Sequence, residues 1–158
     1  ENGIDVLINN AGYLVNETFG QVSENDLRRM YEVNVLGPFR LMQIVIPLLR
    51  EDNSHVISIG SMGGVQGSVK FPGLSAYSSS KGGMSILTEC LAEEYKESNI
   101  KFNCLALGAV QTEMLNEAFP GYEASVSAKE MAQYIYSFAL NGSRFINGKV
   151  ISVSNSTP

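Results

Sequence analysis

The chain has 158 residues, 44% hydrophobic and 17% charged, which suits one folded domain with a core rather than a disordered or coiled-coil chain. With 16 Asp and Glu against 11 Lys and Arg, its net charge of -5 argues against nucleic-acid binding, and no run approaches the roughly 18 apolar residues of a membrane span. His55 is the only histidine and Cys90 and Cys104 are the only cysteines, so we expect no metal site and two reduced core thiols in a cytoplasmic protein.

In chain order, segments that predict strands alternate with segments that predict helices. Strands are expected at 4–8, 55–59, 101–107 and 149–153. A first helix is expected from a cap at Ser23 to about residue 50, with Pro47 bending or ending it, and a second from 76 to about 98. Residues 60–73 predict a loop, and 108–126 predict a longer connection with short helical pieces. A capping box at Ser127 and Glu130 predicts a third helix to about residue 140.

This alternation predicts an α/β fold, a doubly wound parallel sheet of the Rossmann-like type with helices on both faces. Four strands make the sheet look incomplete. Ligands of such folds bind beyond the carboxyl ends of the strands. Three connections fall there: the turn at 9–12, the loop that begins at Ser61 and the connection that begins at Gly108.

Tyr77 and Lys81 are four residues apart near the start of the second helix, so both side chains lie on one helix face. An ammonium group one turn away is expected to lower the pKa of the phenol, which would make Tyr77 a workable general acid or base. A core tyrosine beside a surface lysine is the structural alternative. Taken alone, this spacing does not distinguish the two.

Three further features are unusual for their positions. Ser61 follows a strand directly, where its hydroxyl could reach a bound carbonyl oxygen, although it could equally be an ordinary loop serine. Asn34 falls on the apolar stripe of the first helix, where it could either cap neighbouring backbone or hold a water. Gly82 and Gly83 give the second helix a smooth face that predicts close packing of a cofactor or a partner helix.

Five motifs occur in one order at the predicted strand ends: Asn9-Asn10-Ala11-Gly12, Asn34-Val35-x-Gly37, Ser61, Tyr77-x-x-x-Lys81 and Gly108-x-x-x-Thr112. In this combination the sequence closely resembles the short-chain dehydrogenase/reductase superfamily. The resemblance spans essentially the whole chain, 1–158, from the fourth strand of that fold to its seventh and last. It implies an oxidoreductase that transfers hydride between NAD or NADP and a carbonyl or secondary alcohol, with 3-oxoacyl thioesters as one candidate substrate.

The resemblance also implies roles for individual residues. Tyr77 would be the catalytic acid/base, Lys81 would tune it and bind the nicotinamide ribose, Ser61 would hold the substrate oxygen, and Asn34 would hold a water linked to Lys81. The residues implied to bind cofactor are Asn10, Ala11, Gly12, Tyr77, Lys81, Gly108, Val110 and Thr112. The residues expected to line an apolar substrate pocket or lid are Met114, Leu115, Phe119, Pro120 and Tyr122.

The sequence departs from the family pattern mainly by absence. Family members begin with a strand and a Gly-rich turn that cradles the pyrophosphate, and that segment also sets the choice of NAD or NADP. Nothing like it occurs here, so we expect this chain to be an inactive fragment of a longer protein. Leu107 stands where the family usually has Pro, and the loop between Ser61 and Tyr77 looks about three residues longer than usual.

The resemblance further implies a homodimer or homotetramer, paired through the two long helices, that acts on a small-molecule substrate without nucleic acid or membrane. Two alternatives stay open. The chain could be a non-catalytic scaffold or binding module that kept the core residues. It could also resemble the epimerases and dehydratases that share the Tyr–Lys pair, although those carry a long C-terminal substrate domain.

Overall fold

Within residues 3–155, four parallel strands form the sheet, in the order β1 (Val6–Asn9), β2 (Ser54–Ser61), β3 (Ile100–Leu107) and β4 (Lys149–Val153). The computed structural model describes residues 3–155. All three strand pairs are parallel, and their register aligns Ser61 with Leu107 and Leu107 with Val153. The carboxyl ends of these strands therefore meet at one edge of the sheet, as the sequence predicts for an α/β fold.

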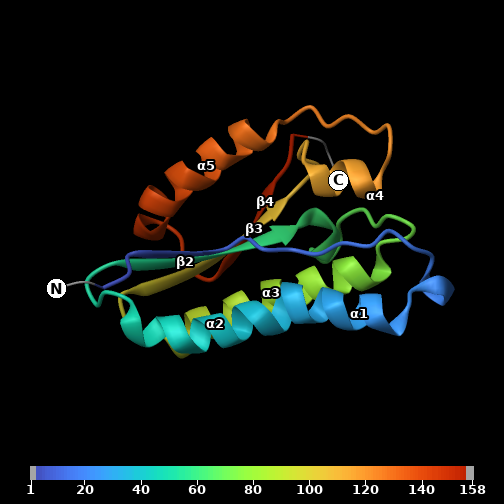
Figure 1. Ribbon diagram of the computed structural model, residues 1–158. Coiled ribbons are helices and arrows are strands. Elements are labelled where there is room, and N and C mark those ends of the chain that lie inside the picture. Colours follow the sequence, from blue (N-terminus) through green and yellow to red (C-terminus); the bar gives the residue numbers. More distant parts are fainter. Residues whose placement is uncertain (1–2, 156–158) are drawn as a thin grey trace.

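Helices cover both faces of this sheet (Figure 1). On one face lie α1 (Glu24–Tyr31), α2 (Gly37–Val45) and α3 (Ser75–Glu94). On the other face lies α5 (Ala128–Asn141), with the short α4 (Glu113–Ala118) at the carboxyl ends of the strands. Short 3-10 turns occupy Phe19–Gln21, Ile46–Leu48, Met62–Gly64 and Gly142–Arg144.

The predicted first helix is interrupted. Its start is confirmed, because the Ser23 hydroxyl accepts a hydrogen bond from the backbone of Asp26. A π-helical turn (Glu32–Leu36) then separates α1 from α2, so a continuous helix to residue 50 was wrong. Pro38 explains this, because it has no N–H for the carbonyl of Asn34 four residues earlier and its ring would crowd that carbonyl. The wider turn relieves the conflict and carries Asn34 within it.

Other boundaries differ by a few residues. β1 begins at Val6 rather than at residue 4, and α3 ends at Glu94 rather than near 98. β2 continues to Ser61, so the expected loop at 60–73 begins with strand and a 3-10 turn. The capping box of α5 and the strand at 149–153 are confirmed. Cys90 is exposed, which corrects the expectation of two core thiols, whereas Cys104 is buried.

Two apolar clusters hold the layers together. The larger packs the far ends of α2 and α3 against the early residues of β2 and β3, with Met42, Met84, Val56 and Phe102 fully buried. The smaller packs α5 against the other face of the sheet. The larger cluster lies away from the carboxyl ends of the strands, whereas the smaller one reaches Leu107 and Val153, the last residues of β3 and β4. Within residues 3–155, no helix is long and apolar enough to cross a membrane.

Candidate active site

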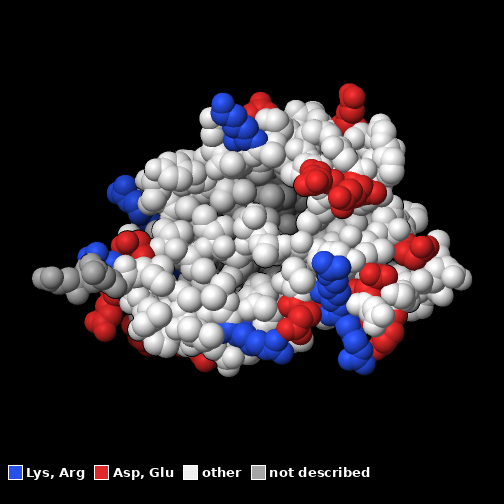
Figure 2. Space-filling model, in the orientation of Figure 1, with Lys and Arg blue, Asp and Glu red and all other residues white. Residues whose placement is uncertain are grey.

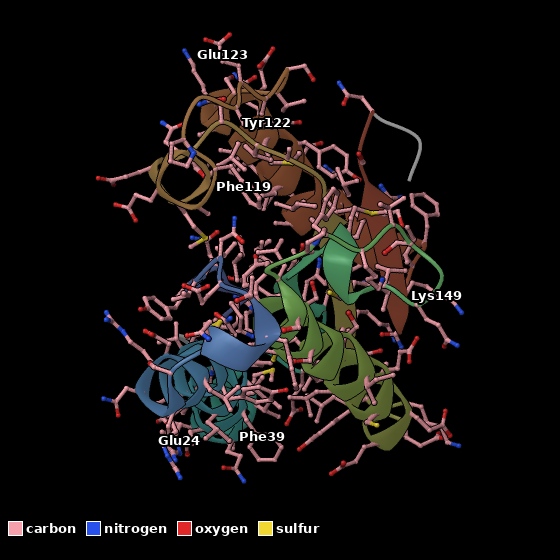
Figure 3. The ribbon with its side chains drawn as sticks, turned by 90° about the vertical axis from the view of Figure 1, so that its right-hand side faces the viewer. Glu24, Phe39, Phe119, Tyr122, Glu123 and Lys149 are labelled. Carbon is pink, nitrogen blue, oxygen red and sulfur yellow. The ribbon has the colours of Figure 1, made fainter. Side chains whose placement is uncertain are left out.

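The side chains singled out in the sequence converge at the carboxyl edge of the sheet. Figure 3 looks onto this edge, with α4 and α5 above and α1, α2 and α3 below. Ser61 ends β2, Tyr77 and Lys81 lie in the first turns of α3, and Gly12 follows β1. The topology therefore brings together residues that are up to 69 positions apart (81 - 12).

Asn34 is 1% exposed, and its side chain forms hydrogen bonds with neighbouring segments. Its Oδ1 accepts from the backbone N–H of Tyr13 at 2.8 Å, and its Nδ2 donates to the carbonyl of Tyr13 at 2.8 Å and to Ser80 Oγ at 2.9 Å. Both amide hydrogens are thus used. The amide ties the turn after β1 to α3, which is the capping role that the sequence left as an alternative.

Lys81 is 4% exposed, although it is a charged residue. Its Nζ donates to the carbonyl of Ile59 at 2.9 Å, and the ammonium group has three donors in total. A Cβ added to Gly12 would lie 3.4 Å from Nζ, so the glycine lets the turn approach the lysine closely. Burial lowers the pKa of Lys81, and the nearby Cys104 raises it in opposition.

Tyr77 is half-buried, and the Lys81 Nζ lies 5.8 Å from the centroid of its ring. Burial raises the pKa of Tyr77, while a hydrogen bond with the Ser61 side chain lowers it. The expected lowering of this pKa by Lys81 was therefore wrong for this structure. Desolvation of the phenolate raises the Tyr77 pKa by more than its neighbours lower it. Ser61, rather than Lys81, is the neighbour that lowers this pKa.

Ser61 is positioned by β2 and by the 3-10 turn that follows it. Its Oγ accepts from the backbone N–H of Gly63 at 3.3 Å. Gly63 itself packs tightly, because a Cβ there would lie 2.7 Å from Ser78 Oγ on α3. The turn thus holds Ser61 against the first turns of α3, where Tyr77 lies.

The residues expected to bind cofactor line the same edge. Asn10 and Ala11 are exposed beside Gly12, and Val110 and Thr112 are half-buried after β3. Gly108 is closely packed, since a Cβ there would lie 2.5 Å from Ser154 Oγ. Thr112 also caps α4 by accepting from the backbone of Leu115 at 3.2 Å, which leaves its hydroxyl hydrogen free to donate.

Asn9 opens the Asn9-Asn10-Ala11-Gly12 motif, but the sequence assigned it no role of its own. It is 7% exposed, and within residues 3–155 neither its Nδ2 nor its Oδ1 has a hydrogen-bond partner. A buried amide without partners costs about 1–3 kcal/mol. Its place at the end of β1, in a run of two asparagines, was the available signal. Together with the remaining donors of Lys81, it fits a site that receives a polar ligand such as a dinucleotide.

Figure 2 shows the molecule side-on to this edge, with an uncharged hollow near the centre of the face and Lys, Arg, Asp and Glu around it. Within the described range, no group of three or more His, Cys, Asp or Glu is placed to hold a metal ion.

The residues expected to line a substrate pocket come from α4 and the segment after it. Met114, Leu115 and Phe119 are half-buried, whereas Tyr122 is 52% exposed. Pro120 is also exposed. Figure 3 shows Phe119 and Tyr122 in the upper half of the view, on the side of α4 and α5, with Glu24 and Phe39 on the opposite side of the site. The Met114 methyl lies 3.6 Å from the position that a Cβ on Gly12 would take, so α4 reaches over the turn after β1.

A separate groove of about 1010 Å³ is lined by α3 between Ser75 and Glu89, by Phe71 and by Val150 of β4. Neither Tyr77 nor Lys81 lines it, so we do not assign the chemistry to it.

Comparison with known proteins identifies the family of this chain. A family model described as short chain dehydrogenase matches residues 2–123. Nodulation protein G of Rhizobium sp. (strain N33) is 32% identical over 164 residues, a match that covers 96% of this chain and 65% of that protein. The 3-oxoacyl-[acyl-carrier-protein] reductase FabG of Thermotoga maritima is 31% identical over 162 residues, covering 95% and 64%. The chain thus spans slightly less than two thirds of the length of these relatives.

Solved structures give the same result. A short chain dehydrogenase of Escherichia coli CFT073, in complex with NADPH, matches with a TM-score of 0.85 at 25% identity, over 95% of this chain and 62% of that chain. A 3-ketoacyl-(acyl-carrier-protein) reductase of Brucella melitensis, in complex with NADH, shares the fold with a TM-score of 0.84 at 22% identity, over 96% and 66%.

Proposed function

This chain belongs to the short chain dehydrogenase family, and from that premise we propose that the full-length protein is an NAD(P)-dependent oxidoreductase of carbonyl and secondary alcohol substrates. The observation that carries the proposal is the convergence of Ser61, Tyr77 and Lys81 at the carboxyl edge of the sheet. A Ser–Tyr hydrogen bond beside a desolvated lysine is an arrangement for moving a proton.

When bound, the nicotinamide cofactor supplies the hydride. Tyr77 donates a proton to the substrate oxygen in reduction and withdraws it in oxidation. Ser61 donates a hydrogen bond to the same oxygen and stabilises the charge that develops there. The donors of Lys81 that Ile59 does not use are available for the ribose hydroxyls of the cofactor.

Asn34 has a more specific role in this proposal than the sequence suggested. Its side-chain amide hydrogens are committed to Tyr13 and Ser80. Its backbone carbonyl, in contrast, lacks the usual helical donor because residue 38 is proline. We assign the water that serves Lys81 to this carbonyl, and assign to the side chain the task of holding the π turn in place.

The remaining assignments follow the family resemblance. Asn10, Ala11 and Gly12 would flank the adenosine half of the cofactor, and Gly108, Val110 and Thr112 would lie near its nicotinamide end. Met114, Leu115, Phe119 and Tyr122 line the substrate pocket, whose apolar character favours a substrate with a hydrocarbon part. The names of the FabG relatives favour a 3-oxoacyl thioester. The choice between NAD and NADP is left open.

The test is the replacement Tyr77→Phe in the full-length polypeptide. Oxidation of NADPH and NADH is followed with 3-oxoacyl thioesters and simple ketones. We expect turnover to fall by about 10²–10⁴-fold, the range of a lost general acid, while cofactor affinity, measured by fluorescence, changes little. Tyr136→Phe, at an exposed position on α5, is the matched control. Wild-type turnover in Tyr77→Phe would contradict the assignment, whereas a wild-type protein that binds cofactor without turning over would favour the scaffold alternative.

We also propose that the full-length protein is a homodimer or homotetramer paired through α3. Ser79, Gly83, Ile86 and Cys90 recur at helical spacing along this helix and are all exposed. Such a stripe of small and apolar side chains allows close helix packing. Sedimentation of the full-length protein tests this, and a monomer at micromolar concentration would refute it.

A further inference from the structure

Three connections surround the carboxyl edge of the sheet: residues 10–23 after β1, residues 65–74 before α3, and residues 108–127 before α5. Asn16, in the first connection, contacts both of the others. No role for this residue follows from its sequence position. Its contacts are therefore informative about how the rim of the site is held.

Asn16 contacts the third connection at the carboxyl end of α4. Asn16 Nδ2 donates to the carbonyl of Ala118 at 2.9 Å. Ala118 is the last residue of α4, a helix of six residues. A helix this short is not stable alone in water, so its position depends on the contacts that tether it.

The second connection fixes the other side of Asn16. Its Oδ1 lies 1.9 Å from the place a Cβ on Gly73 would take, and Gly73 has a φ of 85°. The neighbouring Glu17 donates its backbone N–H to the carbonyl of Gly73 at 3.0 Å. Only glycine at 73 leaves room for the Asn16 amide, and this close approach orients the amide toward α4.

The base of the third connection is held independently by Gln111. Its backbone N–H donates to Val126 at 2.8 Å, its Oε1 accepts from the backbone of Ala124 at 2.7 Å, and its Nε2 donates to Asn116 at 2.5 Å. Because Asn116 lies in α4, loss of the Asn16 contact would loosen the end of α4 at Ala118 and the residues after it, while Gln111 still holds the middle of α4 and the base of the connection.

We propose that Asn16 is a positioning residue that joins the three connections and holds α4 over the site. Through α4 it sets the positions of Met114, Leu115 and Phe119, and so the affinity for a substrate with an apolar part. This inference rests on the proposed function for its catalytic meaning, but its structural part can be measured without turnover.

The test uses Asn16→Asp and Asn16→Ala in the full-length protein. Asp has the shape of Asn, but its ionised carboxylate cannot donate to the Ala118 carbonyl. Hydrogen exchange of the apo protein should then quicken about two- to five-fold at the amides of Phe119 and Tyr122, as expected from one lost hydrogen bond. The amides of Gln111 and Ala124 should keep their wild-type rates.

The kinetic readout separates positioning from catalysis. We expect KM for the carbonyl substrate to rise about two- to five-fold in both variants, with kcat within about two-fold of wild type. Asn25→Asp on α1 makes the same charge change away from α4 and should alter neither quantity.

Unchanged exchange at 115–122 together with unchanged KM would overturn the inference. A loss of kcat with unchanged KM would also overturn it, because a catalytic rather than a positioning role would then be needed. A wild-type protein without carbonyl turnover contradicts the proposed function alone, and the exchange comparison still decides whether Asn16 holds α4.

Discussion

Replacing Asn34 with Ala tests whether the π turn is held by its side chain. The replacement removes three hydrogen bonds, two with the backbone of Tyr13 and one with Ser80. At about 1 kcal/mol each, the gross loss is about 3 kcal/mol. Two effects reduce it. Ser80 keeps its own bond to the carbonyl of Tyr77 at 2.7 Å, and the half-buried Tyr13 backbone can recruit water. We therefore expect a net loss of about 2 kcal/mol in the free energy of unfolding.

The assay is urea unfolding of the full-length protein, read as a shift of the midpoint at constant slope. For a slope of about 2 kcal/mol/M, the midpoint should fall by about 1 M. Tyr13→Phe is the control, because it removes only the bond between the phenol and Asp26 and keeps both backbone bonds to Asn34. We expect this control to cost under about 0.5 kcal/mol. A similarly small loss for Asn34→Ala would show that the amide does not hold the turn.

Three further predictions concern buried groups. Burial lowers the pKa of His55 below its usual value of about 6.5, so the free energy of unfolding should fall as the pH drops below 6.5. His55→Gln should weaken this dependence on pH, and an unchanged dependence would contradict the role of His55. A Cβ on Gly60 would lie 2.6 Å from Cys104 Sγ, so Gly60→Ala should cost about 1–3 kcal/mol, and adding Cys104→Ala should recover part of that loss in a double-mutant cycle. Ser61→Ala should raise the Tyr77 pKa further, because it removes the hydrogen bond that lowers this pKa. Absorbance titration, with and without the Tyr77→Phe replacement, would measure the change, and a lower Tyr77 pKa in Ser61→Ala would refute the role of Ser61.

The sequence predicts the fold well where local signals are complete. The reciprocal bonds of Ser127 and Glu130 begin α5 where the capping box predicts, because both partners are within four residues. The interruption of the first helix was missed, although Pro38 was visible. Its effect depends on a carbonyl four residues earlier, and a stripe of apolar residues conceals the extra residue that a π turn inserts.

The site is predicted less completely, because its chemistry depends on burial. The spacing of Tyr77 and Lys81 correctly places them on one helix, and it cannot reveal that Lys81 donates to Ile59 on a different element. The sign of the Tyr77 pKa shift was wrong for the same reason, since desolvation is a property of the packed structure. The sequence places Asn9 at a strand end, and it likewise cannot reveal that the buried amide has no hydrogen-bond partner.

On the face of the sheet that α1, α2 and α3 cover, the two ends are stabilised by different contacts, and this division bears on function. At the amino ends of the strands, Met42, Val56 and Phe102 form a continuous apolar cluster. At the carboxyl ends of this face, hydrogen bonds from Asn34 and Lys81 connect the layers, while on the other face the α5 cluster extends to Leu107 and Val153. Polar contacts of this kind exchange with water or ligand at small net free energy, whereas apolar packing does not. We therefore expect the α3 side of the carboxyl end, rather than the α5 side, to be the part that rearranges around a bound molecule while the fold persists.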